Sequence, residues 1–294
     1  MPQKKFGSNH TIKKLDCLEK YLKAYLNVFK NRPGIPTIYV DAFAGTGEIP
    51  KASNYEELPL GNEDEAFIVG SARRALEITQ SFSEYIFIEK IRGNARALEK
   101  LKLAYPEKSI SIWNVDANEG LQKLCAQRNW KKCRAVIFLD PFGSQVPWST
   151  LETIAATEAI DLWYLFPAGL SVNRQISRDG SVHDTHEASL DRIFGTADWR
   201  QAFIDIDVSD PDLFGNERSN QVKTATPESV TKYMHHRLTS IFRGGVLDEW
   251  LPLGRNNAHW YSLMFAWANP DPKAKMAGKI AVSVMRSGKI GRAK

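Results

Sequence analysis

Four acidic side chains each follow a short apolar run, and together they suggest a shared ligand site. They are Asp41, Glu89, Asp116 and Asp140. The carboxyl ends of parallel strands in an open α/β sheet face one crevice, where ligands bind. Crowding four like charges is costly unless a ligand or hydrogen-bond donors satisfy them. We therefore favour one shared site over four independent turn or cap residues.

The first of these acids opens a loop of small residues, Asp-Ala-Phe-Ala-Gly-Thr-Gly. Gly45 and Gly47 allow the backbone to approach a nucleotide-like ligand closely, although a plain tight turn is the alternative. In a dinucleotide fold, the acid that binds ribose lies ~20 residues beyond such glycines. Glu89 lies 42 residues beyond Gly47, and the 22 residues of 48–69 account for the excess if they form an inserted loop or lid.

Apolar runs alternate with helical patterns through the first half of the chain. We predict strands at 38–40, 85–88, 109–113, 134–139 and 160–166. We predict helices at 11–30, 71–82, 94–103, 119–127 and 148–156, the second with Ser71 as its N-cap. Such alternation is typical of a parallel sheet covered on both faces. The predicted fold class is α/β, a Rossmann-like and mostly parallel doubly wound sheet.

The second half departs from this rhythm. Residues 168–245 are polar and mostly helical in tendency, without a strand of comparable quality, and we predict a helical insertion on the ligand side of the sheet. Two strands, 246–253 and 259–268, then form a hairpin-like pair, and 280–285 forms a short strand before a basic tail. We interpret 1–294 as a single domain.

Composition and charge exclude some classes of protein. With 43% hydrophobic residues the chain is an ordinary globular one, and its apolar runs are shorter than the ~18 residues of a membrane span. Three cysteines in no paired motif fit a reducing compartment, so we predict a cytoplasmic protein with no membrane partner.

Basic residues gather near both ends of the chain. The net charge is +5, and 273–294 holds seven basic residues and no acid. A second cluster consists of Lys4, Lys5, Lys13 and Lys14. This distribution permits contact with nucleic-acid phosphates, and a solvated tail explains it equally well.

Several motifs resemble those of known methyltransferases. The loop 41–47 resembles the first motif of class I S-adenosylmethionine-dependent methyltransferases. Asp-Pro-Phe-Gly at 140–143 resembles the Asp/Asn-Pro-Pro-Tyr/Phe motif of exocyclic-amine methyltransferases, and is closer still to that of tRNA guanine N2-dimethyltransferases. Over nearly the whole chain the arrangement is similar to the three-Cys-motif partner (TcmP) family, named after a partner protein with three cysteines. That resemblance runs through 10–11, Lys14, 39–45, 70–71, 87–89, 139–143, 173–174 and 260–266.

The resemblance implies S-adenosylmethionine as the cofactor. Glu89 would bind the ribose hydroxyls, and Asp116 would accept from the adenine amino group. Asp41 would order the glycine loop or accept from the methionine amino group. Lys14 could pair with the cofactor's carboxylate, or it could be exposed. The expected cofactor site also includes Phe43, Ala44, Gly45, Gly47, Lys90 and Ala117, with Ile91 or Val115 against the adenine ring.

The motif at 140–143 implies methyl transfer to a nitrogen. The Asp140 carboxylate and the Pro141 carbonyl can accept the two N–H groups of an amine, and Phe142 offers a face for an extruded base. The single proline, and Gly143 in place of a second aromatic, depart from the commonest motif. A strand-ending turn with a buried Phe is the alternative.

The predicted function is N-methylation of an exocyclic amine of a nucleic-acid base, in DNA or RNA. The alternative is an S-adenosylmethionine-binding partner subunit of a three-Cys-motif protein, with little catalysis of its own. A nicotinamide-dependent oxidoreductase is disfavoured because the third glycine is missing.

Two weaker clusters lie in 168–245. His183 and His186 have a His-x-x-His spacing but no clear third ligand, so we predict no metal site. A substrate-gripping wall of Arg174, Arg178, Arg192 and Trp199 is conceivable, but an ordinary exposed face fits these residues better.

Overall fold

The structure is a computed structural model that describes residues 9–46, 70–209, 218–254, 258–286 and 291–292. Gly47 and the proposed lid at 48–69 therefore lie outside the described residues, as does most of the basic tail beyond Arg286. Among the described helices, none combines the length and the apolarity that crossing a membrane requires.

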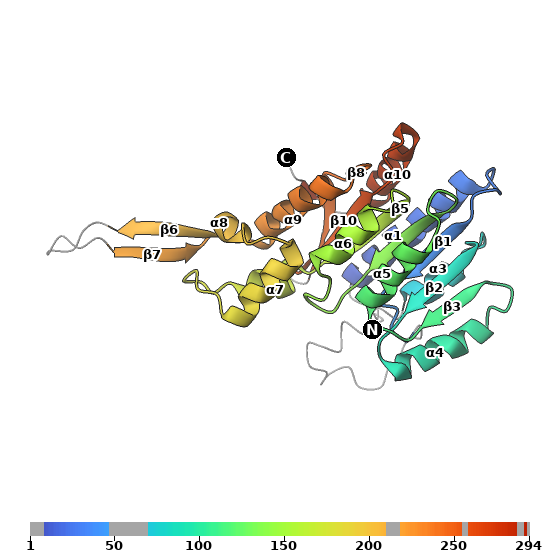
Figure 1. The fold of residues 1–294 in the computed structure, drawn as a ribbon, viewed down its shortest axis with the longest axis horizontal. Coiled ribbons are helices and arrows are strands. Elements are labelled where there is room, and N and C mark those ends of the chain that lie inside the picture. The colour runs from blue at the N-terminus through green and yellow to red at the C-terminus, as the bar shows by residue number, and fades with distance from the viewer. Residues whose placement is uncertain (1–8, 47–69, 210–217, 255–257, 287–290, 293–294) are drawn as a thin grey trace, which may run out of the picture.

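A nine-stranded sheet forms the centre of the molecule (Figure 1). Its parallel part consists of β1 (Thr37–Asp41), β2 (Glu84–Ile88), β3 (Ile110–Trp113), β4 (Arg134–Leu139) and β5 (Ile160–Phe166). Their spatial order is β3-β2-β1-β4-β5, so the strand order reverses between β1 and β4. Crevices at such reversals bind ligands in open α/β sheets.

Antiparallel strands extend the sheet beyond β5. β10 (Tyr261–Trp267) pairs with β5, and β9 (Glu249–Leu253) pairs with β10. The short strands β8 (Gly245–Val246) and β11 (Gly291–Arg292) pair with β10 and β9 respectively. The predicted hairpin-like pair near the C-terminus is thus confirmed.

Helices cover both faces of the sheet, so its central strands are buried on both sides. Along β4, Val136 and Phe138 belong to one apolar cluster, and Ala135, Ile137 and Leu139 to the other. The first cluster includes side chains of α1 (Asn9–Phe29), α3 (Ser71–Leu76), α4 (Arg92–Leu103) and α10 (Lys275–Met285). The second includes side chains of α5 (Ala117–Gln127), α6 (Trp148–Ala155) and α9 (Pro227–Ile241). The predicted fold class, a Rossmann-like and mostly parallel doubly wound sheet, is confirmed.

The helix predicted at 71–82 is shorter than expected. It ends at Leu76, and its N-cap position is occupied by Gly70, not by Ser71. The chain leaves the helix and buries Phe82 beside Tyr39 and Tyr85, where the Phe82 amide donates to the Tyr85 hydroxyl at 3.1 Å. Core packing has overridden the local helix preference here.

The strand predicted at 280–285 is wrong, because these residues belong to α10. Ala281 and Met285, four residues apart, are fully buried on the helix face that packs against α1. Cys17 of α1 donates from Sγ to the Val284 carbonyl at 3.3 Å. The β-branched residues of this segment suggested a strand, but the spacing of its buried residues is helical.

The segment 168–245 contains helices, as expected, and also a hairpin that the sequence analysis missed. Its helices include the short η1 (Ala168–Val172) and η2 (Asn173–Gln175), α7 (Asp184–Phe194), α8 (Trp199–Phe203) and α9. The strands β6 (Ile204–Ser209) and β7 (Arg218–Lys223) pair antiparallel and extend away from the main sheet (Figure 1). Apolar and polar residues alternate along 204–209, which is a strand signal, but strand-disfavouring aspartates obscured it.

Candidate functional site

All four predicted acids lie on the carboxyl edge of the parallel strands. Asp41 is the last residue of β1, Glu89 directly follows β2, and Asp140 directly follows β4. Asp116 follows β3 as the N-cap of α5. Because these strands are neighbours in the order β3-β2-β1-β4, residues far apart in the chain meet at one edge of the sheet.

A buried ion pair joins α1 to the end of β4. Lys14 is fully buried, and its Nζ lies 2.6 Å from Oδ2 of Asp140. The same ammonium lies 5.6 Å from the centre of the Phe138 ring. The suggested exposed position of Lys14 is therefore wrong, and Lys14 cannot belong to a basic surface cluster. Within the protein, the charge of Asp140 is balanced by Lys14.

Asp41 is a second buried acid beside this pair. Its Oδ1 accepts from the Phe43 amide at 3.4 Å, while its buried Oδ2 has no hydrogen-bond partner in the described part of the chain. Burial raises the pKa of Asp41 to about 7; the charge of Asp140 adds to this, while a Ser71 hydrogen bond, the Phe43 amide and Lys14 oppose it. The pKa of Asp41 therefore lies well above the usual range of an aspartate.

The glycine loop closes onto Glu89. The Gly45 amide donates to Oε2 of Glu89 at 2.9 Å, and the Ile91 amide donates to Oε1 at 2.6 Å. Gly45 has a φ of +61°, which favours glycine, and the Ala44 amide donates to the Ile88 carbonyl at 3.1 Å. Glu89 thus helps to order the loop, a task that the sequence analysis considered for Asp41.

Asp116 lies at a more exposed position of the same edge. It accepts from the Asn118 amide at 2.9 Å and from Lys90 Nζ at 3.2 Å. Its pKa is lowered because these donors outweigh partial burial. Asn114, which sequence reasoning missed, donates from Nδ2 to the Glu89 carbonyl at 2.8 Å and to that of Lys90 at 3.0 Å. It ties the loops after β2 and β3 together.

Apolar side chains lie beside these acids. Ile91 is 55% exposed and Val115 is 39% exposed. Ile91 lies two residues after Glu89, and Val115 directly precedes Asp116. The two side chains therefore offer exposed apolar surfaces at this edge. Ala44 and Ala117 are buried, and Phe43 packs in part against the core.

The Asp-Pro-Phe-Gly motif forms a tight turn after β4. The Phe142 amide donates to Oε1 of Gln145 at 3.1 Å, and Gly143 has a φ of +63°. Pro141 is buried, whereas Phe142 and Gly143 are half-buried. The Phe142 ring is therefore neither fully exposed nor part of the fully buried core.

Side chains outside the motif brace this turn. The hydroxyls of Ser144 and Ser171 lie 2.6 Å apart, and Gln175 donates from Nε2 to Ser144 Oγ at 2.8 Å. Arg192 of α7 donates to the Ser144 carbonyl at 2.6 Å. Ser144 adjoins the motif in sequence, but nothing in the sequence pointed to Ser171 and Gln175, which come from η1 and η2.

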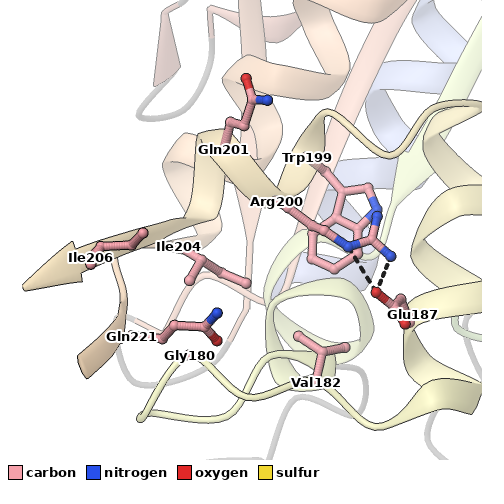
Figure 2. A pocket seen from close by; sticks show the side chains of 9 residues that line it. All are labelled: Gly180, Val182, Glu187, Trp199, Arg200, Gln201, Ile204, Ile206 and Gln221. Atoms are coloured by element: carbon pink, nitrogen blue, oxygen red, sulfur yellow. Dashed lines mark hydrogen bonds and ion pairs between the residues drawn. The ribbon is translucent and has the colours of Figure 1, made fainter. Parts of the chain in front are cut away.

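The suggested arginine–tryptophan wall is not a single surface. Arg174 and Arg178 are exposed and Arg192 reaches Ser144, whereas Trp199 is fully buried and donates from Nε1 to Asp191 Oδ1 at 2.7 Å. Figure 2 shows Arg200 across the Trp199 ring, 4.5 Å from its centre, paired with Glu187. This pair borders a cavity of about 310 Å³ at the base of the β6–β7 hairpin.

His183 and the three cysteines have structural surroundings. His183 is the N-cap of α7, where its Nδ1 accepts from the Thr185 amide at 3.3 Å. Cys17, Cys125 and Cys133 are free and buried. Across the described ranges, no group of three or more His, Cys, Asp or Glu side chains is placed to hold a metal ion.

Comparisons with known proteins find solved structures that resemble this one only weakly. No protein-family model and no curated protein sequence matches the chain. The structure is similar to protein LPL1258 from Legionella pneumophila, with 14% identity and a TM-score of 0.41, over 80% of this chain and 94% of that one. It is also similar to yhhF, a proposed methyltransferase from Escherichia coli, with 12% identity and a TM-score of 0.30, over 69% of this chain and 84% of that one. Such low similarities carry no argument about function, and the fold class rests on the strand order and pairing.

Proposed function

We propose that this chain binds S-adenosylmethionine at the carboxyl edge of its sheet and methylates an exocyclic amine of a nucleic-acid base. The observation that carries the proposal is the meeting of Asp41, Glu89 and Asp140 at the point where the strand order reverses. The described parts of the two motif resemblances, 41–46 and 140–143, lie at this edge.

The residues present suit an adenosine-containing cofactor. Each carboxylate oxygen of Glu89 accepts one hydrogen bond from a backbone amide and has a further lone pair. Both oxygens can therefore accept hydrogen bonds from ribose hydroxyls. The exposed Ile91 and Val115 side chains would be covered by a planar base. The orphaned Oδ2 of Asp41 would gain a donor from a ligand amino group or from a water.

S-adenosylmethionine, when bound, supplies an electrophilic methyl group. Asp140 and the Pro141 carbonyl would accept the amine's N–H groups, which orients the nitrogen lone pair and favours the positive charge that develops on it. Lys14 offsets the cost of keeping the Asp140 charge buried and fixes Oδ2, which leaves Oδ1 for the amine. Phe142, half-buried at the turn, would contact the base.

Calorimetric titration of the full chain with S-adenosylmethionine tests the binding step. We expect saturable binding that weakens at least tenfold in Glu89→Gln and in Asp41→Asn. Glu99→Gln, an exposed carboxylate on α4, is the matched control and should bind as the wild type does. No binding by the folded wild type at millimolar ligand would overturn the proposal.

Methyl transfer is tested separately with labelled cofactor and mixtures of RNA or DNA. We expect labelled nucleic acid with the wild type and at least a hundredfold slower labelling with Asp140→Asn, because the variant loses the charge that stabilises the transition state. The Glu99→Gln control should retain the wild-type rate. Binding without transfer to any nucleic acid would contradict the enzymatic half of the proposal and favour the partner-subunit alternative.

Membership of the TcmP family, a three-Cys-motif partner protein and a cytoplasmic location belong to the same proposal. The motif segments given above support the family and the partner, and three free, buried cysteines fit the cytoplasmic location. The β6–β7 hairpin, which extends from the main sheet and exposes Ile206, would be the surface that such a partner contacts. Co-purification of the chain with a three-Cys-motif protein, lost on deletion of the hairpin, is the expected result.

A further inference from the structure

A second cavity lies at the opposite, amino edge of the same strands. It has a volume of about 500 Å³ and lies between α1, the first residues of β4 and β5, and α10. We call it the amino-edge cavity. Its lining includes Tyr21, Tyr25, Arg134, Asp161 and Ala277. Arg134 begins β4 and Asp140 follows its end, so the two sites lie roughly 20 Å apart at ~3.3 Å per residue.

Two polar groups in this cavity lack full hydrogen bonding. Asp161 accepts from the Tyr21 hydroxyl through Oδ2 at 2.7 Å, and Oδ1 takes no part in that bond. The Asp161 side chain remains 9% exposed, and it lines the cavity. The hydroxyl of Tyr25 is buried and has no partner in the described part of the chain. Buried polar groups without partners are costly, so this site is suited to a ligand that bonds to them.

The walls of the cavity are apolar and aromatic. The rings of Tyr21 and Tyr25 lie 6.1 Å apart, and Phe29 lies 4.8 Å from Tyr25. Ala277 and Ile280 of α10 form the opposite wall. A volume of this size is usual for small-molecule sites, and the part of the lining between α1 and α10 is mainly apolar and aromatic.

The charged groups around Asp161 come from three segments. Arg134 of β4 already donates to the carbonyls of Trp130 and Cys133, at 3.1 and 2.8 Å. The mouth carries Arg32, which precedes β1, and Asp271 and Lys273, which follow β10. The mouth therefore offers both signs of charge, while among the described residues the inner carboxyl of Asp161 is hydrogen-bonded to the neutral Tyr21 hydroxyl alone.

We propose that the amino-edge cavity binds a small primary ammonium compound with an apolar body. An ammonium group has three donors and no acceptor, so it suits Asp161 Oδ1, and a further donor would be available to the Tyr25 oxygen. A ligand carboxylate would be repelled by Asp161, and a hydroxyl has a single proton to donate. The aromatic rings beside the carboxyl also attract a cation.

The proposal predicts that binding depends on pH. Burial raises the pKa of Asp161 to about 7, while the Tyr21 hydrogen bond and the charge of Arg134 oppose this rise. Asp161 is then mostly ionised at pH 8 and mostly protonated at pH 6, and a primary amine keeps its charge at both. Affinity should therefore fall about tenfold from pH 8 to pH 6.

The test uses 2-phenylethylamine as the probe, with 2-phenylethanol and phenylacetate as neutral and anionic analogues. Ligand-observed NMR and calorimetry on the full chain measure binding at both pH values. We expect the amine to bind at least tenfold more tightly than either analogue at pH 8. Equal binding of the three compounds, or no amine binding at millimolar concentration, would overturn the proposal.

Two variants locate the site independently. Asp161→Asn removes the charge, and Ala277→Phe fills the cavity from α10 without altering the carboxyl; each should weaken amine binding at least tenfold. Glu99→Gln is the control for loss of one carboxylate and should bind as the wild type does. Wild-type affinity in either folded cavity variant would show that the amine binds elsewhere and would contradict the assignment.

Discussion

Each edge of the parallel sheet holds a buried aspartate with a raised pKa, Asp41 at the carboxyl edge and Asp161 at the amino edge. The two differ in the groups that surround the carboxyl. At the carboxyl edge, Asp41 lies beside the Lys14–Asp140 ion pair. At the amino edge, Asp161 has the neutral hydroxyl of Tyr21. Burial raises the pKa to about 7 at both positions.

The difference shows that similar pKa values can arise from different neighbouring charges and hydrogen bonds. At the carboxyl edge one ammonium serves two carboxyls, so a proton on Asp41 leaves one neutral ion pair in the buried site. At the amino edge no cation has Asp161 as its hydrogen-bonded partner in the described structure, so its charge is stabilised by the Tyr21 hydroxyl and by the charge of Arg134. The first edge is internally compensated, and the second is open to a ligand.

The largest expected effect is the loss of the internal cation. Lys14→Met should destabilise the protein by about 3–5 kcal/mol, because it leaves Asp140 as an uncompensated buried charge. Denaturant unfolding measures this, with Lys13→Met, an exposed neighbour on α1, as the matched control within about 0.5 kcal/mol. Similar losses of unfolding free energy in both variants would contradict a stabilising role of the buried Lys14–Asp140 pair.

The pH dependence of stability comes next. A carboxyl whose folded-state pKa is raised stabilises the fold below its unfolded pKa of 3.8, and that contribution is lost as the pH rises through about 7. Between pH 5 and pH 8 the wild type should therefore lose about 2–3 kcal/mol of unfolding free energy relative to Asp161→Asn.

The same comparison with Asp41→Asn sharpens the contrast. We expect a similar relative gain at pH 8, since the pKa of Asp41 is also raised to about 7. Unfolding curves at the two pH values measure both variants. A gain in Asp161→Asn but none in Asp41→Asn would show that Lys14 already compensates two negative charges.

Two tyrosines on α1 provide a smaller, matched test of the amino edge. Tyr21→Phe removes the hydroxyl that bonds Asp161, and should cost about 2 kcal/mol at pH 8. Tyr25→Phe removes a buried hydroxyl without a described partner, so stability should stay within about 0.5 kcal/mol or rise. Thermal and urea unfolding compare them, and equal losses would contradict the assigned hydrogen bonding.

The smallest effect concerns the loop that closes on Glu89. Gly45→Ala should destabilise by about 1 kcal/mol, because alanine resists a φ of +61°. Gly93→Ala, within α4 and with open space around it, should stabilise by about 0.5–1 kcal/mol. The opposite signs, measured by urea unfolding, would confirm that the loop requires glycine; a neutral Gly45→Ala would refute this.

Local pattern was sufficient for the parallel sheet. The strands predicted at 134–139 and 160–166 agree with β4 and β5, because apolar runs between helices have few alternatives to a buried parallel strand. Local pattern failed at α10 and at the β6–β7 hairpin. In those segments β-branched residues or aspartates gave a preference that packing against α1, or pairing between the two strands, overrode.

The sequence by itself determined that acids follow successive strands, and parallel topology then required Asp41, Glu89, Asp116 and Asp140 to share an edge. Only the tertiary structure decided that Lys14 is buried against Asp140, 126 residues away, and that Tyr21 bonds Asp161 across the other edge. The physical reason is that hydrogen bonding and burial depend on how α1 packs against the sheet. Nothing in the local pattern of either partner specifies that packing.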